Sequence, residues 1–156
     1  MKKKRYIKAL IAIAALSVLI YYCFHPLIYE KNYYWKLGIG ESHLYESVVK
    51  RKGEPLSVRQ NEDEDWIVYY DGLEIKYDVI TAAFRSVTVT GSQHRFGIRR
   101  IGLGTPRKKI ESVYRHIQKM KDLPDDEFGV IDGGKWVWFE FDENNNVSKI
   151  TIADGL

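Results

Sequence analysis

The sequence predicts an α+β fold in which two αβββ repeats form one antiparallel sheet with helices on one face, preceded by an N-terminal transmembrane helix. Three observations support this fold class. LGIG at Leu37–Gly40 and IGLG at Ile101–Gly104 match, and each precedes a helix pattern. Alternating apolar residues, typical of half-buried strands, follow each helix pattern. An apolar run without any Asp, Glu, Lys or Arg fills residues 9–29.

The apolar run predicts a membrane anchor. About 20 apolar residues in a helix span a bilayer core of about 30 Å, so we expect residues 9–29 to cross the membrane and residues 30–36 to lie next to it. Cations stay on the cytoplasmic side, so MKKKRYIK at residues 1–8 is predicted to be a cytoplasmic tail. The predicted location is therefore the cell membrane, single-pass, with residues 37–156 outside.

The end of the apolar run bears on processing. It reads LIYYCFHPLIY and lacks the small residues that signal cleavage requires, which favours a retained anchor. Tyr21 and Tyr22 stand where small residues would precede a lipidated Cys23, which argues against a lipoprotein. Cys23 is the one cysteine, so we expect neither a disulfide framework nor a cysteine metal site in the outer domain.

The charge balance argues against nucleic-acid binding. Five of the 24 Lys and Arg residues lie in the N-terminal tail, which leaves 19 against 21 Asp and Glu in the rest of the chain. A slightly acidic domain lacks the electrostatic attraction for phosphates on which such binding depends.

The outer domain is predicted to be an internal duplication of one structural unit. We expect repeat one at residues 37–91, a linker at 92–100 and repeat two at 101–156. YESVV at Tyr45–Val49 and IESVY at Ile110–Tyr114 lie 65 residues apart, within these repeats. One unit alone buries too little apolar surface to be stable, so we expect both to share a single sheet.

Each repeat begins with a predicted helix. In the first, Ser42 is the expected N-cap and the helix runs to Lys52 before Gly53. In the second, Thr105 is the expected N-cap and Pro106 the first helical residue. Apolar residues at i, i+3, i+4 and i+7 spacing mark its buried side: Ile110, Val113, Tyr114 and Ile117.

Hairpin signals and alternation assign the two faces of the sheet. Asp71-Gly72 predicts a tight turn, as does the segment around Asp132–Gly134. Residues that flank a two-residue turn share a face. The face expected under the helices carries Trp66, Val68, Tyr70, Leu73, Ile75, Tyr77, Val87, Val89, Phe128, Val130, Val137, Phe139, Phe141, Ile150 and Ile152.

The opposite face is predicted to be open and to bind a protein partner. Exposed aromatic rings bracketed by charges are typical anchors of protein interfaces. We therefore expect partner contacts from Tyr69, Lys76, Phe84, Trp138 and Glu140. The alternative is that these rings make stabilising cross-strand pairs or are covered by the linker.

Motifs for catalysis or metal binding are incomplete. DENNN at Asp142–Asn146 opens like a calcium loop, but Val147 and Ala153 replace its glycine and bidentate acid, so a hairpin turn is expected. The four histidines show no zinc spacing, and no G-x-S-x-G turn occurs. We expect no enzyme activity, no metal and no cofactor.

LGIGESHLYESVVKRKGEP, and IGLGTPRKKIESVYRHI followed by KWVWFEFDENNNVSKITI, resemble the repeat of β-lactamase-inhibitor-protein-like domains and of small outer-membrane assembly lipoproteins of the SmpA/OmlA type. This resemblance implies tandem units that contact proteins through the open sheet face or its loops. We expect a membrane-anchored, extracytoplasmic protein-binding module, with an immunity or inhibitor role as one version. The alternatives are an envelope assembly or structural factor, and a small-molecule or cell-wall sensor.

Overall fold

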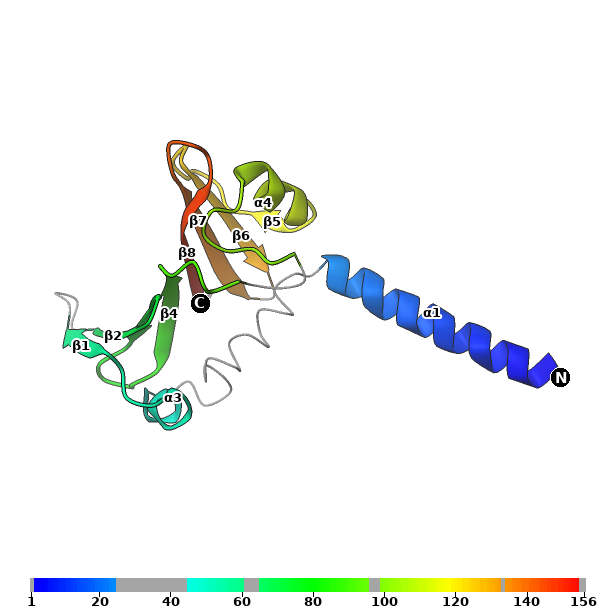
Figure 1. Cartoon of the computed structure of the whole chain (residues 1–156), viewed down its shortest axis with the longest axis horizontal. Helices are drawn as coiled ribbons and strands as arrows, with labels where there is room; N and C mark the ends of the chain where they lie inside the picture. Colours follow the sequence, from blue (N-terminus) through cyan, green and yellow to red (C-terminus); the bar gives the residue numbers. More distant parts are fainter. Residues whose placement is uncertain (1, 25–44, 61–64, 96–98, 133, 155–156) are drawn as a thin grey trace.

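The structure is a computed structural model that describes residues 2–24, 45–60, 65–95, 99–132 and 134–154. Eight strands form one antiparallel sheet in the order β1-β2-β3-β4-β8-β7-β6-β5 (Figure 1). The elements are α1 (Lys2–Phe24), α3 (Tyr45–Lys52), β1 (Ser57–Gln60), β2 (Trp66–Tyr70), β3 (Leu73–Tyr77), β4 (Phe84–Val89), α4 (Arg107–Val113), β5 (Gln118–Lys119), β6 (Glu127–Asp132), β7 (Lys135–Phe141) and β8 (Val147–Asp154).

The predicted fold of two αβββ repeats is wrong. The eight strands form one continuous sheet, and their order does not show two separate repeats. Strands β1 and β5 were not predicted. All four residues of β1 are exposed and β5 has only two residues, so neither carries the alternation of buried and exposed positions that marks a half-buried strand.

The predicted transmembrane helix is also wrong. Within the part of the chain that the structure describes, no helix combines the length and the apolarity needed to cross a bilayer. Helix α1 ends at Phe24, so it covers only residues 9–24 of the predicted span 9–29. The predicted single-pass location at the cell membrane is therefore not supported. The predicted juxtamembrane residues 30–36, the segment Leu37–Gly40 and the N-cap Ser42 lie outside the described residues.

The predicted turns occur where the sequence places them. Asp71 and Gly72 join β2 to β3, with Tyr70 paired to Leu73, and Gly72 has the positive φ of 69° that this turn requires. Asp142 begins the turn between β7 and β8, where its Oδ1 atom accepts hydrogen bonds from the backbone N–H groups of Asn144 at 2.9 Å and Asn146 at 2.8 Å. The calcium-like segment is therefore a hairpin turn.

One face of the sheet forms the core, as predicted. Thirteen of the fifteen inward-facing residues predicted from alternation are buried, and Trp66 and Tyr70 pack against them half-buried. Val48 of α3 and Ile110 of α4 belong to the same cluster. Both helices thus contribute to a single core that extends across β2–β4 and β6–β8.

Helix α4 starts differently from the prediction. Pro106, rather than Thr105, is the N-cap, and it makes no side-chain cap hydrogen bond. The Thr105 hydroxyl is buried and accepts a hydrogen bond from the backbone N–H of Gly102 at 3.0 Å. A buried hydroxyl requires a hydrogen-bond partner. Gly102 of the IGLG segment is that partner, so the Thr105 hydroxyl does not cap α4.

Arg107 connects α4 to the sheet through a ring contact and hydrogen bonds. Its guanidinium carbon lies 4.9 Å from the centre of the Phe141 ring, and its Nε atom donates to Glu111 at 2.9 Å. The guanidinium also donates to the backbone carbonyls of Asp125 and Glu127. The planar fork of Arg suits this combination of ring and carbonyl contacts.

Candidate functional site

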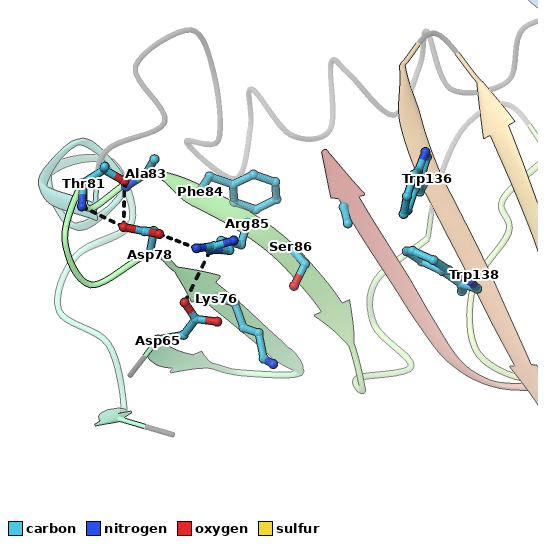
Figure 2. A pocket seen from close by; sticks show the side chains of 11 residues that line it. Asp65, Lys76, Asp78, Thr81, Ala83, Phe84, Arg85, Ser86, Trp136 and Trp138 are labelled. Carbon is cyan, nitrogen blue, oxygen red and sulfur yellow. Dashed lines mark hydrogen bonds and ion pairs between the residues drawn. The ribbon is translucent and has the colours of Figure 1, made fainter. Parts of the chain in front are cut away.

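The open face of the sheet contains a groove above its central strands. β4 pairs with β8, which places Ser86 opposite Ala153 and Thr88 opposite Thr151. These side chains are small, whereas the flanking strands β3 and β7 carry Lys and Trp residues. The resulting groove has a volume of about 510 Å³ and is lined by Asp65, Lys76, Asp78, Thr81, Ala83, Phe84, Arg85, Ser86, Trp136, Trp138 and Ala153 (Figure 2).

Two tryptophans form one wall of the groove. Trp136 and Trp138 lie two positions apart on β7, so their side chains share a face. Their ring centres are 5.6 Å apart with the planes at 81°, an edge-to-face pair. Ala153 and Thr151 are their partners on β8, and these small neighbours leave both rings half-buried beside open space.

A charged cluster forms the other wall. Figure 2 shows Arg85 between Asp78 and Asp65; its Nη2 atom pairs with Asp78, and its Nε atom lies 3.4 Å from Asp65 Oδ1. Asp78 Oδ1 also accepts hydrogen bonds from the backbone N–H groups of Ile80 and Thr81 and from the Thr81 hydroxyl. The bonds from Thr81, with smaller contributions from Arg85 and Ile80, lower the pKa of Asp78 to about 2. This carboxylate is therefore held in its charged form.

Lys76 lies on β3, opposite Ser86 of β4. Within the described ranges it has no ion-pair partner. Lys76 is half-buried and lines the charged wall of the groove, and Lys side chains in such positions keep the ammonium group at the surface. Lys76 therefore supplies a positive charge that the rest of the described chain leaves uncompensated.

Three of the five residues predicted to bind a partner come together in the groove: Lys76, Phe84 and Trp138. Tyr69 and Glu140 do not line it. The Tyr69 ring packs under Arg59, whose guanidinium carbon is 5.6 Å from the ring centre. Glu140 forms an ion pair with Lys149 across the β7–β8 ladder at 2.5 Å.

Phe84 was expected on the open face, and its exposure of only 8% corrects that prediction. A register shift between Lys76 and Tyr77 pairs Phe84 with Tyr77, so the Phe84 ring turns toward the core and only borders the groove. Alternation along β8 also predicts Val147 on the open face, together with Lys149 and Thr151. Val147 is buried instead, because a second register shift falls between Glu140 and Phe141.

The predicted site did not include Trp136, Arg85 or the acidic partners of Arg85. Trp136 could have been found, because it lies two residues before Trp138 on a predicted strand. The cluster around Arg85 had no such signal, since Asp65, Asp78 and Arg85 come from three different segments of the chain.

The side chains that line the groove are of kinds that suit ligand binding rather than metal coordination. It offers indole surface, hydroxyl groups and charged side chains, and no three His, Cys, Asp or Glu residues within the described ranges are grouped so that they could hold a metal. The expectation that the protein is not an enzyme stays a prediction.

No protein-family model matches the sequence. No curated protein matches it either. The fold is similar to those of solved bacterial structures. An extracellular protein containing a SCP domain from Bacillus anthracis aligns with a TM-score of 0.55 and 14% identity, over 70% of this chain and 42% of that one. A cysteine-rich secretory protein from Staphylococcus aureus aligns with a TM-score of 0.52 and 13% identity, over 70% and 41%.

A DUF4309 family protein (YjgB) from Bacillus subtilis aligns with a TM-score of 0.50 and 13% identity, over 75% of this chain and 82% of that one. The chain thus spans about two fifths of the length of the first two proteins, and the likeness to all three is one of fold. None of them is described as a β-lactamase-inhibitor-like domain or an outer-membrane assembly lipoprotein, so that resemblance stays an expectation.

Proposed function

We propose that this protein is an extracytoplasmic protein-binding module that holds a segment of its partner in the groove on the open sheet face. One observation carries the proposal. Two half-buried tryptophans, Trp136 and Trp138, face a floor of small side chains on a sheet face that no described helix covers. Trp is enriched among the residues that dominate binding energy at protein interfaces.

The location outside the cytoplasm is supported by the similar structures. Two of them are described as an extracellular and a secretory protein. An immunity or inhibitor role, in which the partner is a secreted toxin or enzyme, is one version of the proposal. An envelope assembly factor that uses the same face is another.

A second candidate function is binding of a small molecule, as in a cell-wall sensor. The observation that favours it is the groove volume of about 510 Å³, which falls within the range typical of small-molecule sites. The groove lies on an open sheet face, however, and such sites usually enclose most of the ligand surface. A protein segment, which needs only one side covered, fits the geometry better.

Affinity capture with the full chain from the cells that make it tests the proposal. Replacing Trp138 with Ala should weaken capture of the partner by about 10- to 100-fold while the thermal unfolding midpoint stays near that of the wild type. Leu56→Ala is the matched control, because it removes a 75% exposed apolar side chain away from the groove. Capture that survives Trp138→Ala in the folded protein would contradict the proposal, and capture of a small molecule alone would favour the second candidate.

A further inference from the structure

The most exposed charged side chain of the groove is basic. Four charged residues line it, two acidic and two basic: Asp65, Asp78, Lys76 and Arg85. The Arg85 side chain is 54% exposed, whereas Asp65 and Asp78 are 16% and 20% exposed. A partner that enters the groove therefore meets the Arg85 guanidinium before it meets the two carboxylates.

The two carboxylates are already occupied by the protein. Asp78 accepts bonds from Thr81 and Ile80 through Oδ1 and pairs with Arg85 through Oδ2, and Asp65 pairs with Arg85 through Oδ1. The Asp78 carboxylate, which accepts four such bonds, has little capacity left for a ligand cation. Arg85 keeps part of its five-donor fork at the surface, and Lys76 has no ion-pair partner in the described part of the chain.

The other charged residues on this face do not line the groove. Glu140 and Lys149 neutralise each other at 2.5 Å. Glu74 lies two residues from Lys76 on the same side of β3, beside Thr88 of β4 and Tyr69 of β2, and it does not line the groove.

The aromatic and cationic walls lie at a distance suited to a peptide. Lys76 on β3 lies three strand spacings from β7, or roughly 14 Å, and Arg85 on β4 lies two spacings from β7, or roughly 10 Å. An extended chain rises about 3.3 Å per residue, so about three to four residues bridge the two walls. A single small group cannot reach both.

Resting on the proposed function, we infer that the groove recognises a partner-protein segment that places an acidic side chain beside Lys76 and Arg85 and an apolar side chain against Trp136 and Trp138. The small floor residues Ser86 and Ala153 admit the backbone of this segment. Charge-assisted bonds to Lys and Arg select the acid, and the indole pair selects the apolar group.

Selection of a phage-displayed library of random linear peptides on the full chain tests this inference. Peptides enriched on the wild type should combine Asp or Glu with an apolar residue a few positions away. Selection on Lys76→Glu should shift the enrichment toward Lys and Arg. A synthetic wild-type-selected peptide should bind Lys76→Glu at least about tenfold more weakly, and Lys76→Gln by a smaller factor.

Lys108→Glu is the matched control, because it reverses an exposed charge on α4, away from the groove, and should leave peptide affinity unchanged. Thermal unfolding of each variant establishes that it is folded. Enriched peptides that require Trp138 but bind Lys76→Glu as tightly as the wild type would overturn the inference and leave the proposed function standing. Absence of enriched peptides, or enrichment that Trp138→Ala does not affect, would overturn both.

Discussion

Strands β1–β4 and strands β5–β8 fill the core with different aromatic residues. In the first half Tyr77 is fully buried, with edge-to-face contacts to Tyr45 at 5.6 Å and Phe84 at 6.5 Å, and its hydroxyl has no hydrogen-bond partner among the described residues. In the second half Phe139 packs against Tyr114 and Phe128 and buries no polar atom of its own. The first half therefore retains an unpaired buried hydroxyl that costs free energy, whereas the described residues of the second half bury no unpaired side-chain polar atom.

The open faces of the two halves differ as well. The first half contributes the charged wall of the groove and the second half contributes the aromatic wall. Each wall alone is an ordinary strand surface. Because β4 pairs with β8, the two meet across a floor of small residues, and the binding site exists only at the junction.

Substitution of the hairpin glycines should give the largest difference between the two halves in the free energy of unfolding. Gly72 and Gly134 both have positive φ, 69° and 79°, but a Cβ atom on Gly72 would lie 2.5 Å from the Gly91 Cα, whereas one on Gly134 would meet nothing within 4 Å. Gly134→Ala should therefore cost only the backbone penalty, about 1 kcal/mol, and Gly72→Ala about 3 kcal/mol. Urea unfolding of both variants measures these losses of stability. Equal losses would show that the backbone at Gly91 can move away from a Cβ atom at position 72 at little cost in free energy.

Adding a hydroxyl to the core of the second half should lower the free energy of unfolding. Phe139→Tyr places an oxygen among buried rings, so we expect a loss of about 2 kcal/mol in the free energy of unfolding. Denaturant titration gives this value. Unchanged stability would mean that the new hydroxyl finds a partner or water, and that the core of the second half is less closed than described.

Removing the buried hydroxyl from the first half should maintain or raise the stability of the protein. Tyr77→Phe removes the buried hydroxyl and should leave the protein unchanged or up to about 1 kcal/mol more stable. Burial, with nearby Tyr70 and Tyr45, raises the pKa of Tyr77 well above its ordinary value of 10.0. The wild type should therefore lose stability as the pH rises past 10, where the unfolded chain ionises, and the variant should lose less. A destabilised Tyr77→Phe would reveal a partner for the hydroxyl.

The smallest expected effect concerns the charged wall at low pH. Because the pKa of Asp78 is lowered to about 2, its contribution to stability is complete above the ordinary value of 3.8 and is lost as the pH falls toward 2. Asp78→Asn should flatten the dependence of the unfolding midpoint on pH across this window. Arg85→Gln should retain most of that dependence, because the hydrogen bonds from Thr81 are the larger cause. Identical acid profiles for the wild type and Asp78→Asn would contradict the assignment.

Period-two alternation was enough to predict the core face, because most strands are buried on one side only. It failed at Phe84 and Val147, where a one-residue register shift reverses the face and no local pattern announces the shift. It also missed β1, which has no buried residue.

The groove could not be predicted from local patterns. Ser86 and Ala153 are unremarkable small residues in their own strands, and they form a floor only because β4 and β8, distant in sequence, are neighbours in the sheet. Lys76 and Trp138 were found because each stands out within its own strand. Their roles on opposite walls depend on the strand order.

The most direct test of the account follows the indole N–H signals of the full chain by nuclear magnetic resonance while the captured partner is added. The account predicts that the signals of Trp136 and Trp138 shift or broaden. The signal of Trp66, whose ring packs against the core beside Tyr45, should stay in place. Binding that moves Trp66 and leaves both groove tryptophans unchanged would contradict the claim that the junction of the two half-sheets is the binding site.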